Sequence, residues 1–245
     1  MEIRSQRDMD MQPSIHPRTE SSAVAPLPPL QSGDRLSRHE FERRYQLMPP
    51  NVKAELIEGI VYMPSPVRAT NHARPHALIM AWLGAYWFAT PGVDLFDNAT
   101  LRLDLDNEPQ PDAALCIDPA RGGQARIGED DYLEGAPELV VEVAASSAAY
   151  DTGDKLKVYR RNGVAEYLIW TIYERRLDWW RLSEGRYVPL PIDADGVIPS
   201  RVFPSLYLHV ASLLAEERAT VLAILQQGLA SAEHAAFVQL LGADQ

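Results

Sequence analysis

One segment of the sequence constrains the fold most, because it places a compact helix between two runs of strand length. ELVVEVA at 138–144 is a nearly continuous apolar run, as expected for a strand covered on both faces, and EYLIWTIYE at 166–174 is a strong second strand. The helix predicted at 151–163 has Asp151 as its N-cap and Gly163 just past its end. This order predicts a right-handed crossover within one sheet.

Further elements surround this unit. Apolar residues recur at helical spacing from His72 to about Phe88, and Asn71 is a suitable cap for that helix. From residue 72 the predicted order is α–β–β–β–α–β–β, which indicates a mixed α/β sheet with helices on both faces. The other strand candidates are VDLFDNATLRLDL at 93–105, PDAALCI at 111–117 and the hairpin RRLDWWRLSEGRYVPL at 175–190.

The two ends of the chain differ in pattern from its centre. Residues 1–33 are polar with a proline-rich end, which predicts a mobile tail. Residues 34–210 are predicted to form one domain that starts with a short helix and a hairpin turning at Glu58–Gly59. Residues 211–245 return to helical periodicity, and their apolar stripe suits either a cover for the sheet or a contact with another subunit.

Composition excludes several classes of protein. No stretch reaches about 18 uninterrupted apolar residues, so no transmembrane span or membrane partner is expected. The N-terminus lacks the apolar core of a signal peptide and Cys116 is the only cysteine, so we expect a cytoplasmic protein with Cys116 as a core residue. The net charge of −11 argues against nonspecific binding of nucleic acid by the whole chain.

Three residues in the central elements could carry chemistry. Asp112 opens a predicted buried strand, Glu142 lies within ELVVEVA, and Lys155 occupies the first turn of the following helix. A buried carboxylate is unfavourable unless it is paired or binds a metal, and two on neighbouring strands could hold Mg²⁺. With a lysine to position water or offset phosphoryl charge, the set suits metal-assisted phosphodiester hydrolysis. Alternatively, Asp112 only caps the end of a strand and Glu142 pairs with an internal lysine or arginine.

Several other residues have two interpretations. His72 and His76 are spaced to bind zinc on one helix face, but without a nearby cysteine or third histidine they also fit an exposed pair. Tyr159 shares a helix face with Lys155 and is expected to pack beside it. The Trp179–Trp180 pair stands among arginines, which fits either a nucleic-acid surface or a hairpin packed on the core.

At these residues the sequence resembles the Uma-two endonuclease-like family of the PD-(D/E)XK nuclease superfamily. The resemblance covers roughly residues 38–210, and the spacing from Glu142 to the strand EYLIW is its most specific part. The matching motifs are AELIEGIVYMPSP, His72, QPDAALCI, ELVVEVAASSAAYDTGDKLKVYRRNGVAEYLIW and VIPSRVFPSLYLHV.

The resemblance implies a restriction-endonuclease-like αβββαβ core, a DNA substrate and a divalent ion, Mg²⁺ or Mn²⁺. It places the metal ligands at Asp112 and Glu142, and a third carboxylate from the N-terminal part would suit the superfamily, which makes Glu55 a possible ligand. The alternative for Glu55 is a solvated charge on a hairpin.

The lysine of the superfamily usually lies two residues after the acid, where this chain has Ala144. The resemblance implies that the lysine comes instead from the following helix, at Lys155. Lys157 is the alternative, but it lies about 200° around the helix from Lys155. The chain also departs from the family at AASSAA, after the acid, and at Thr171.

The site hypothesis requires the two carboxylates and the lysine to converge in a cleft open to solvent. A rival interpretation is a nuclease-like domain without catalysis that binds nucleic acid or a protein. A second rival is an interaction protein that uses its C-terminal helix. A homodimer would let two sites act on two strands.

Overall fold

The computed structural model describes residues 27–63 and 69–243 of the chain. Its central sheet consists of β3 (Val93–Asp97), β5 (Ala113–Ile117), β8 (Leu139–Ala144), β9 (Glu166–Thr171), β10 (Arg176–Ser183) and β11 (Arg186–Pro189). The strand order is β11-β10-β9-β8-β5-β3. β8 and β9 pair in parallel and the other neighbours pair antiparallel, which confirms the predicted mixed sheet.

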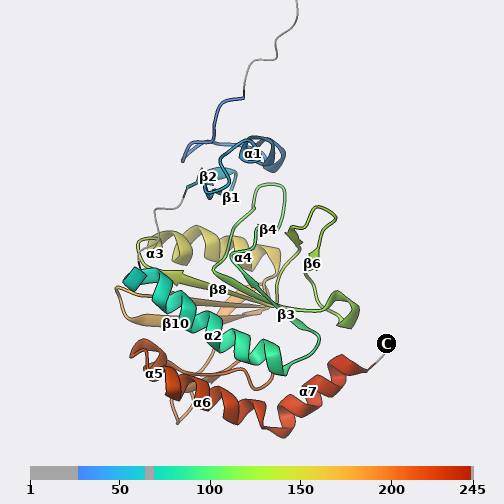
Figure 1. Cartoon of the computed structure of the whole chain (residues 1–245), viewed down its shortest axis with the longest axis vertical. Helices are drawn as coiled ribbons and strands as arrows, with labels where there is room; N and C mark the ends of the chain where they lie inside the picture. Colours follow the sequence, from blue (N-terminus) through green and yellow to red (C-terminus); the bar gives the residue numbers. More distant parts are fainter. Residues whose placement is uncertain (1–26, 64–68, 244–245) are drawn as a thin grey trace, which may run out of the picture.

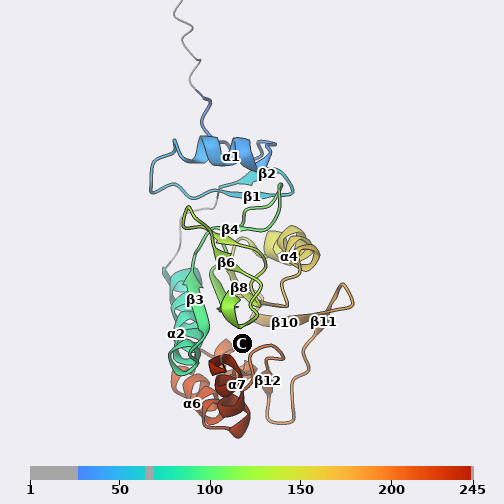
Figure 2. The same ribbon diagram turned by 90° about the vertical axis from the view of Figure 1, so that its right-hand side faces the viewer.

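Helices cover both faces of this sheet, as predicted (Figure 1). One face carries α2 (Arg74–Ala89) and the C-terminal helices α5 (Val210–Leu214), α6 (Arg218–Leu229) and α7 (Ala232–Gly242). The other face carries α4 (Leu156–Asn162), so that α2 and α4 lie on opposite sides of β8 in Figure 2.

Alternation along β8 assigns its side chains to these two layers. Val141 and Val143 belong to the apolar cluster that includes α2, whereas Val140 and Ala144 belong to the cluster that includes Tyr159 of α4. Because side chains alternate along a strand, Glu142 shares the face of Val140 and Ala144. The position of Glu142 beneath α4 therefore follows from the strand register.

The N-terminal part of the chain packs on one end of this body. It consists of α1 (Arg38–Tyr45) and a hairpin of β1 (Glu55–Ile57) and β2 (Ile60–Tyr62), which lie together at the top of Figure 1. The hairpin turns at Glu58–Gly59, where both residues have positive φ, of 53° and 69°, as expected for a tight two-residue turn. Leu56 exchanges two backbone hydrogen bonds with Glu108, which fixes the hairpin to the body.

Smaller elements complete the described chain. The three-stranded sheet β4-β7-β6 and the β12-β13 hairpin lie outside the central sheet. Their bounds, with those of the short helical segments, are β4 (Leu101–Arg102), β6 (Arg126–Ile127), β7 (Leu133–Glu134), β12 (Val197–Pro199), β13 (Tyr207–His209), η1 (Ala69–Ala73), η2 (Pro119–Arg121), α3 (Ala148–Tyr150) and η3 (Asp151–Lys155).

Two features of the ends bear on the predicted boundaries. Most of the predicted tail, residues 1–26, lies outside the described residues, but within residues 27–33 Leu30 is buried in the N-terminal apolar cluster. In the C-terminal extension, Val221 and Leu225 are buried against the cluster that contains α2. The apolar stripe of α6 therefore covers the sheet layer. Within the described residues, no helix is long and apolar enough to cross a membrane.

Three local predictions were wrong. The strand expected at 93–105 ends at Asp97, because Asn98 adopts a positive φ of 52°, and Leu105 is 74% exposed. Asn71 lies inside the turn η1 and donates a hydrogen bond to the hydroxyl of Tyr173, so it does not cap α2. Asp151 does not begin a helix either, because helical structure already starts at Ala148.

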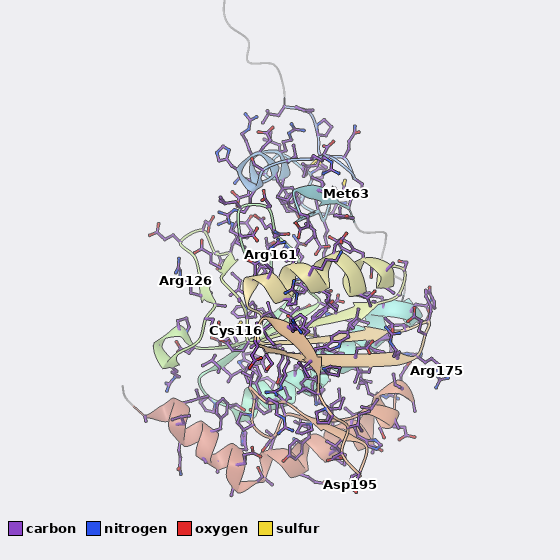
Figure 3. All side chains as sticks on the ribbon, turned by 180° about the vertical axis from the view of Figure 1, so that it is seen from behind. Met63, Cys116, Arg126, Arg161, Arg175 and Asp195 are labelled. Atoms are coloured by element: carbon purple, nitrogen blue, oxygen red, sulfur yellow. The ribbon has the colours of Figure 1, made fainter. Side chains whose placement is uncertain are left out.

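The interpretation of two other residues is clear from burial. Trp179 is 2% exposed and donates from Nε1 to Glu166 Oε2, so at Trp179 the hairpin packs on the core. Cys116 is 3% exposed and lies inside the molecule, as Figure 3 shows. Burial raises the pKa of its thiol, which disfavours the thiolate that a nucleophile requires.

Candidate active site

Asp112 and Glu142 lie on adjacent strands. Because Ala113 of β5 pairs with Val141 of β8 in antiparallel register, the residue before Ala113 lies beside the residue after Val141. The carboxylate of Asp112 crosses to β8, where its Oδ2 accepts a hydrogen bond of 2.6 Å from the backbone N–H of Val143. The register of two central strands thus fixes Asp112 next to Glu142.

Lys155 connects this strand pair to the helical layer. It is the last residue of η3, directly before α4, and its Nζ lies 3.0 Å from Glu142 Oε1. Its side chain is 4% exposed. Lys157, the alternative lysine, is 63% exposed and pairs with Asp154 at 2.9 Å on the outer side of the helix. Of these two lysines, it is Lys155 that contacts Glu142.

Glu55 joins the same cluster from the N-terminal hairpin. Its Oε1 lies 2.8 Å from Lys155 Nζ and also accepts a hydrogen bond from the backbone N–H of Gln110. The hairpin is held over α4 by an ion pair between Glu58 and Arg161 at 2.7 Å, and Figure 3 shows Arg161 between α4 and the N-terminal part. Glu55 is therefore a buried member of the cluster, and the alternative of a solvated hairpin charge is wrong.

A fourth carboxylate was not predicted as part of the site. Asp151 Oδ1 lies 3.6 Å from Lys155 Nζ, and the residue is 2% exposed. Its spacing of four residues before Lys155 was a usable signal, because an acid and a base four apart face each other on a helix. Because Asp151 was interpreted as the N-cap of the helix, its pairing with Lys155 was not predicted.

Tyr159 orients the Glu142 carboxylate. Its hydroxyl donates a hydrogen bond of 2.8 Å to Glu142 Oε1, the same oxygen that Lys155 contacts. Both hydrogen bonds shown for this carboxylate in the described part of the chain therefore end on Oε1. This arrangement fixes one oxygen of Glu142 and leaves Oε2 as the atom that can face a ligand.

Two histidines, His72 of η1 and His76 of α2, flank Asp112. His72 Nε2 lies 3.2 Å from Asp112 Oδ1, and His76 Nε2 lies 3.2 Å from Asp97 Oδ1 and 3.1 Å from the carbonyl oxygen of Asp112. Across residues 27–63 and 69–243, no three His, Cys, Asp or Glu side chains are arranged to hold a metal ion. Among the described residues, the two histidines therefore do not form a zinc site. They are not a simple exposed pair either, because each contacts an aspartate.

The cluster holds more negative than positive charge. Glu55, Asp112, Glu142 and Asp151 are each 8% exposed or less, and Lys155 is the ammonium among them. Burial raises the pKa of Glu142 and Asp151, and this outweighs the attraction of Lys155. Burial lowers the pKa of Lys155, but the charges of Glu142, Glu55 and Asp151 outweigh burial and raise it well above its usual value. Lys155 therefore stays protonated while its carboxylates compete for one cation.

This charge excess fits an additional hard cation. Carboxylate oxygens are the ligands that Mg²⁺ and Mn²⁺ prefer, and buried carboxylates without enough positive charge gain most from such an ion. The present spacing of the carboxylates is set by Lys155, which contacts two of them at 3.0 Å or less. The donor chemistry therefore fits a divalent ion, although the oxygens have to rearrange around it.

The contact between His72 and Asp112 predicts a pH-dependent contribution to stability. The hydrogen bond to Asp112 outweighs partial burial and raises the pKa of His72. The contribution is then complete below the unfolded pKa of about 6.5 and is lost as pH rises through the higher folded pKa. In EDTA, we expect His72→Gln to lower the free energy of unfolding by about 1 kcal/mol at pH 5.5, and by less at pH 9. Urea unfolding at both values measures this, and an equal deficit at both would contradict it.

The chain is similar to known proteins both in sequence and in fold. The sequence model of the Uma2 family, described as "Putative restriction endonuclease", matches residues 38–211. A solved structure, described as the crystal structure of a putative nuclease belonging to DUF820 from Anabaena variabilis ATCC 29413, has a similar fold with a TM-score of 0.53. The two chains are 14% identical over 71% of this chain and 96% of the other. No curated protein sequence matches the chain.

Proposed function

Because the chain belongs to the Uma2 family of restriction endonuclease-like proteins, we propose that it is a metal-dependent endonuclease that hydrolyses phosphodiester bonds in DNA. The observation that supports this proposal most directly is the cluster around Lys155. Residues from the N-terminal hairpin, from β8 and from the helical segment meet there, and Asp112 lies on the strand next to Glu142. Three buried carboxylates thus share one ammonium, and the fourth, Asp112, lies beside them on the neighbouring strand.

In this proposal Asp112 and Glu142 hold the metal ion, and Glu55 is available as a further ligand. When bound, a divalent ion supplies a Lewis acid for a phosphoryl oxygen and lowers the pKa of coordinated water. Hydrogen bonds within the protein position both proposed ligands. The Val143 N–H donates to Asp112 Oδ2, and Tyr159 and Lys155 donate to Glu142 Oε1. These hydrogen bonds hold one oxygen of each carboxylate, and the other oxygens have to shift toward a bound ion.

Lys155 is suited to one of the two roles that a lysine can fill in such a site. Its raised pKa means that the amine carries its proton at neutral pH, so it cannot take a proton from water. A fixed ammonium instead stabilises negative charge that develops on the phosphoryl group and on the leaving oxygen. We therefore assign Lys155 to charge stabilisation and not to general base catalysis.

The test of this function is cleavage of supercoiled plasmid by the purified chain. We expect nicked or linear DNA in about 10 mM Mg²⁺ or Mn²⁺, a concentration high enough to saturate a weak carboxylate site. In EDTA we expect the plasmid to stay intact. Adding Mg²⁺ back after EDTA controls for loss of the protein. Cleavage that persists in EDTA, or no cleavage with either ion, would contradict the proposal.

One observation favours a binding module as the second candidate function. The predicted cleft open to solvent is wrong, because the carboxylates and Lys155 are nearly closed to solvent, whereas catalysis on DNA requires an open cleft. Hydrolysis at this cluster therefore requires part of the covering structure to move. Calorimetry with Mn²⁺ separates the two functions, because an endonuclease takes up the ion at Asp112 and Glu142, whereas a binding module has no need of it.

A further inference from the structure

The two carboxylate oxygens of Asp112 have different neighbours. Oδ2 accepts the hydrogen bond of 2.6 Å from the backbone N–H of Val143 in β8. Oδ1 lies 3.2 Å from Nε2 of His72 in η1. Because Oδ2 is held against the sheet, Oδ1 is the oxygen of Asp112 that can bind the proposed divalent ion. An ion bound there lies beside His72.

The spacing of His72 Nε2 and Asp112 Oδ1 suits two ligands of one ion. Neighbouring ligands of an octahedral ion with bonds of about 2.1 Å lie about 3 Å apart. The observed separation is 3.2 Å. A metal ion binds the neutral imidazole through one ring nitrogen, so Nε2 and Oδ1 can hold it together without a change in the backbone.

His72 lies on the solvent side of the carboxylate cluster. Its side chain is 24% exposed and that of Asp112 is 10% exposed, whereas the side chains of Glu142 and Asp151 are 5% and 3% exposed. An ion that arrives from solvent therefore meets His72 and Asp112 before it reaches the deeper carboxylates.

His76, the neighbouring histidine, is held by other contacts. Its Nε2 lies 3.1 Å from the carbonyl oxygen of Asp112 and 3.2 Å from Asp97 Oδ1. A carbonyl oxygen only accepts hydrogen bonds, so this nitrogen carries the proton and has no lone pair for a metal. In contrast, Nδ1 of His72 has no hydrogen-bond partner among the described residues, so no hydrogen bond at Nδ1 opposes a small rotation of the ring toward an ion.

We propose that His72 Nε2 is a ligand of the divalent ion, next to Asp112 Oδ1, and that it makes the site prefer a transition-metal ion such as Mn²⁺ to Mg²⁺. Carboxylates and water accept both ions, whereas imidazole favours transition metals. This inference rests on the proposed function, because it concerns the ion of the same site.

The other ligand has to move to complete this set. Within residues 27–63 and 69–243, no three His, Cys, Asp or Glu side chains already surround one point. His72 and Asp112 therefore form a pair at ligand spacing, and Glu142 joins them only by turning its Oε2 toward the ion. A ligating histidine usually donates its second N–H to a partner that strengthens binding. Because the described residues offer His72 Nδ1 no such partner, we expect moderate affinity.

Pulsed electron paramagnetic resonance of Mn²⁺ bound to the full chain tests the assignment without reference to cleavage. With less Mn²⁺ than protein, the ion occupies its tightest site, and a directly bonded nitrogen nucleus gives a coupling that oxygen ligands do not give. We expect this nitrogen coupling in the wild type and its loss in His72→Gln, which keeps an N–H donor for Asp112 but has no imidazole nitrogen.

His76→Gln is the matched control, because it removes the neighbouring imidazole. We expect the nitrogen coupling to remain in this variant, and thermal unfolding in EDTA confirms that both variants are folded. A coupling that survives His72→Gln, or that is lost in His76→Gln as well, would overturn the assignment of His72 as the ligand. Bound Mn²⁺ without any nitrogen coupling in the wild type would overturn it too.

Calorimetry separates the failure of this inference from the failure of the proposed function. In His72→Gln we expect the affinity for Mn²⁺ to fall at least about tenfold and the affinity for Mg²⁺ to change less than about threefold. Asp112→Asn should weaken the binding of both ions. Equal losses for the two ions in His72→Gln would overturn this inference alone. If neither ion binds the wild type, or if Asp112→Asn leaves binding unchanged, the proposed function fails as well.

Discussion

Glu142→Gln is expected to lower Mg²⁺-dependent cleavage of plasmid DNA by at least about 10²-fold under single-turnover conditions. Glutamine keeps an oxygen that can accept the hydrogen bond from Tyr159, but it removes the negative charge that the proposed metal ion requires. The loss therefore reports on charge at the site and not on packing. The initial rate of nicking, measured with enzyme in excess over plasmid, gives the ratio to wild type.

Glu138→Gln is the matched control for this variant. Glu138 is 4% exposed and directly precedes β8, but its carboxylate accepts hydrogen bonds from the backbone N–H groups of Ile117 and Gln124, away from Lys155. We expect this variant to cleave within about threefold of wild type at a temperature where it is folded. Equal rates for Glu142→Gln and wild type would remove Glu142 from the proposed site.

Lys155→Met is expected to lower the free energy of unfolding by about 3–5 kcal/mol at pH 7, the range for removing one partner of a buried ion pair. Methionine fills a similar volume but leaves Glu55, Glu142 and Asp151 without the ammonium that they share. The pKa values of Glu142 and Asp151, already raised by burial, then rise further. Urea unfolding at pH 7 measures the difference from wild type.

The loss of stability in Lys155→Met is expected to depend on pH, and the direction follows from the pKa values of the carboxyl groups. A carboxyl whose pKa is raised in the folded state binds more protons when folded, so it adds stability at low pH and loses it as pH rises through the folded pKa. The deficit of Lys155→Met should therefore shrink from pH 7 to pH 5. Lys157→Met, at an exposed lysine on the same helical segment, should stay within about 0.5 kcal/mol of wild type. A small deficit for Lys155→Met at pH 7, or one that grows at pH 5, would contradict the account.

The contact between Glu142 and Lys155 was predictable from the sequence for a local reason. Glu142 lies inside a strand whose apolar pattern determines the face of the sheet on which its side chain lies, and Lys155 directly precedes α4, the helix that packs on that face. The connection between the two is short, so few arrangements are available to them. The position of Asp112 was also predictable, because a buried run of strand length follows it directly.

Glu55 and His72 could not be placed in the same way. Glu55 reaches the cluster only because the hairpin docks on the body through Leu56 and Glu108, more than fifty residues apart. His72 contacts Asp112 because a helical turn precedes α2, and the sequence pattern placed the helix start at His72 itself. Long-range docking of this kind leaves no periodic signal in the chain.

The break in the strand expected at 93–105 has a different cause. The alternating leucines from Leu101 to Leu105 predicted one continuous strand, but Asn98 adopts a positive φ and its N–H bonds to the carbonyl of Asp112. Asparagine tolerates this conformation better than most residues, so its presence was the available signal for a turn. The short β4 then pairs in another sheet with β7.

The central claim is that Asp112 and Glu142 together hold a divalent ion beside Lys155. Anomalous diffraction from crystals grown with Mn²⁺ tests it most directly, because the ion is located without reference to activity. We predict one peak about 2.0–2.3 Å from an oxygen of each carboxylate, with Glu142 Oε2 as its ligand and Lys155 still near Oε1. A fully Mn²⁺-equilibrated crystal with no peak there, or with the peak bound only to other residues, would contradict it.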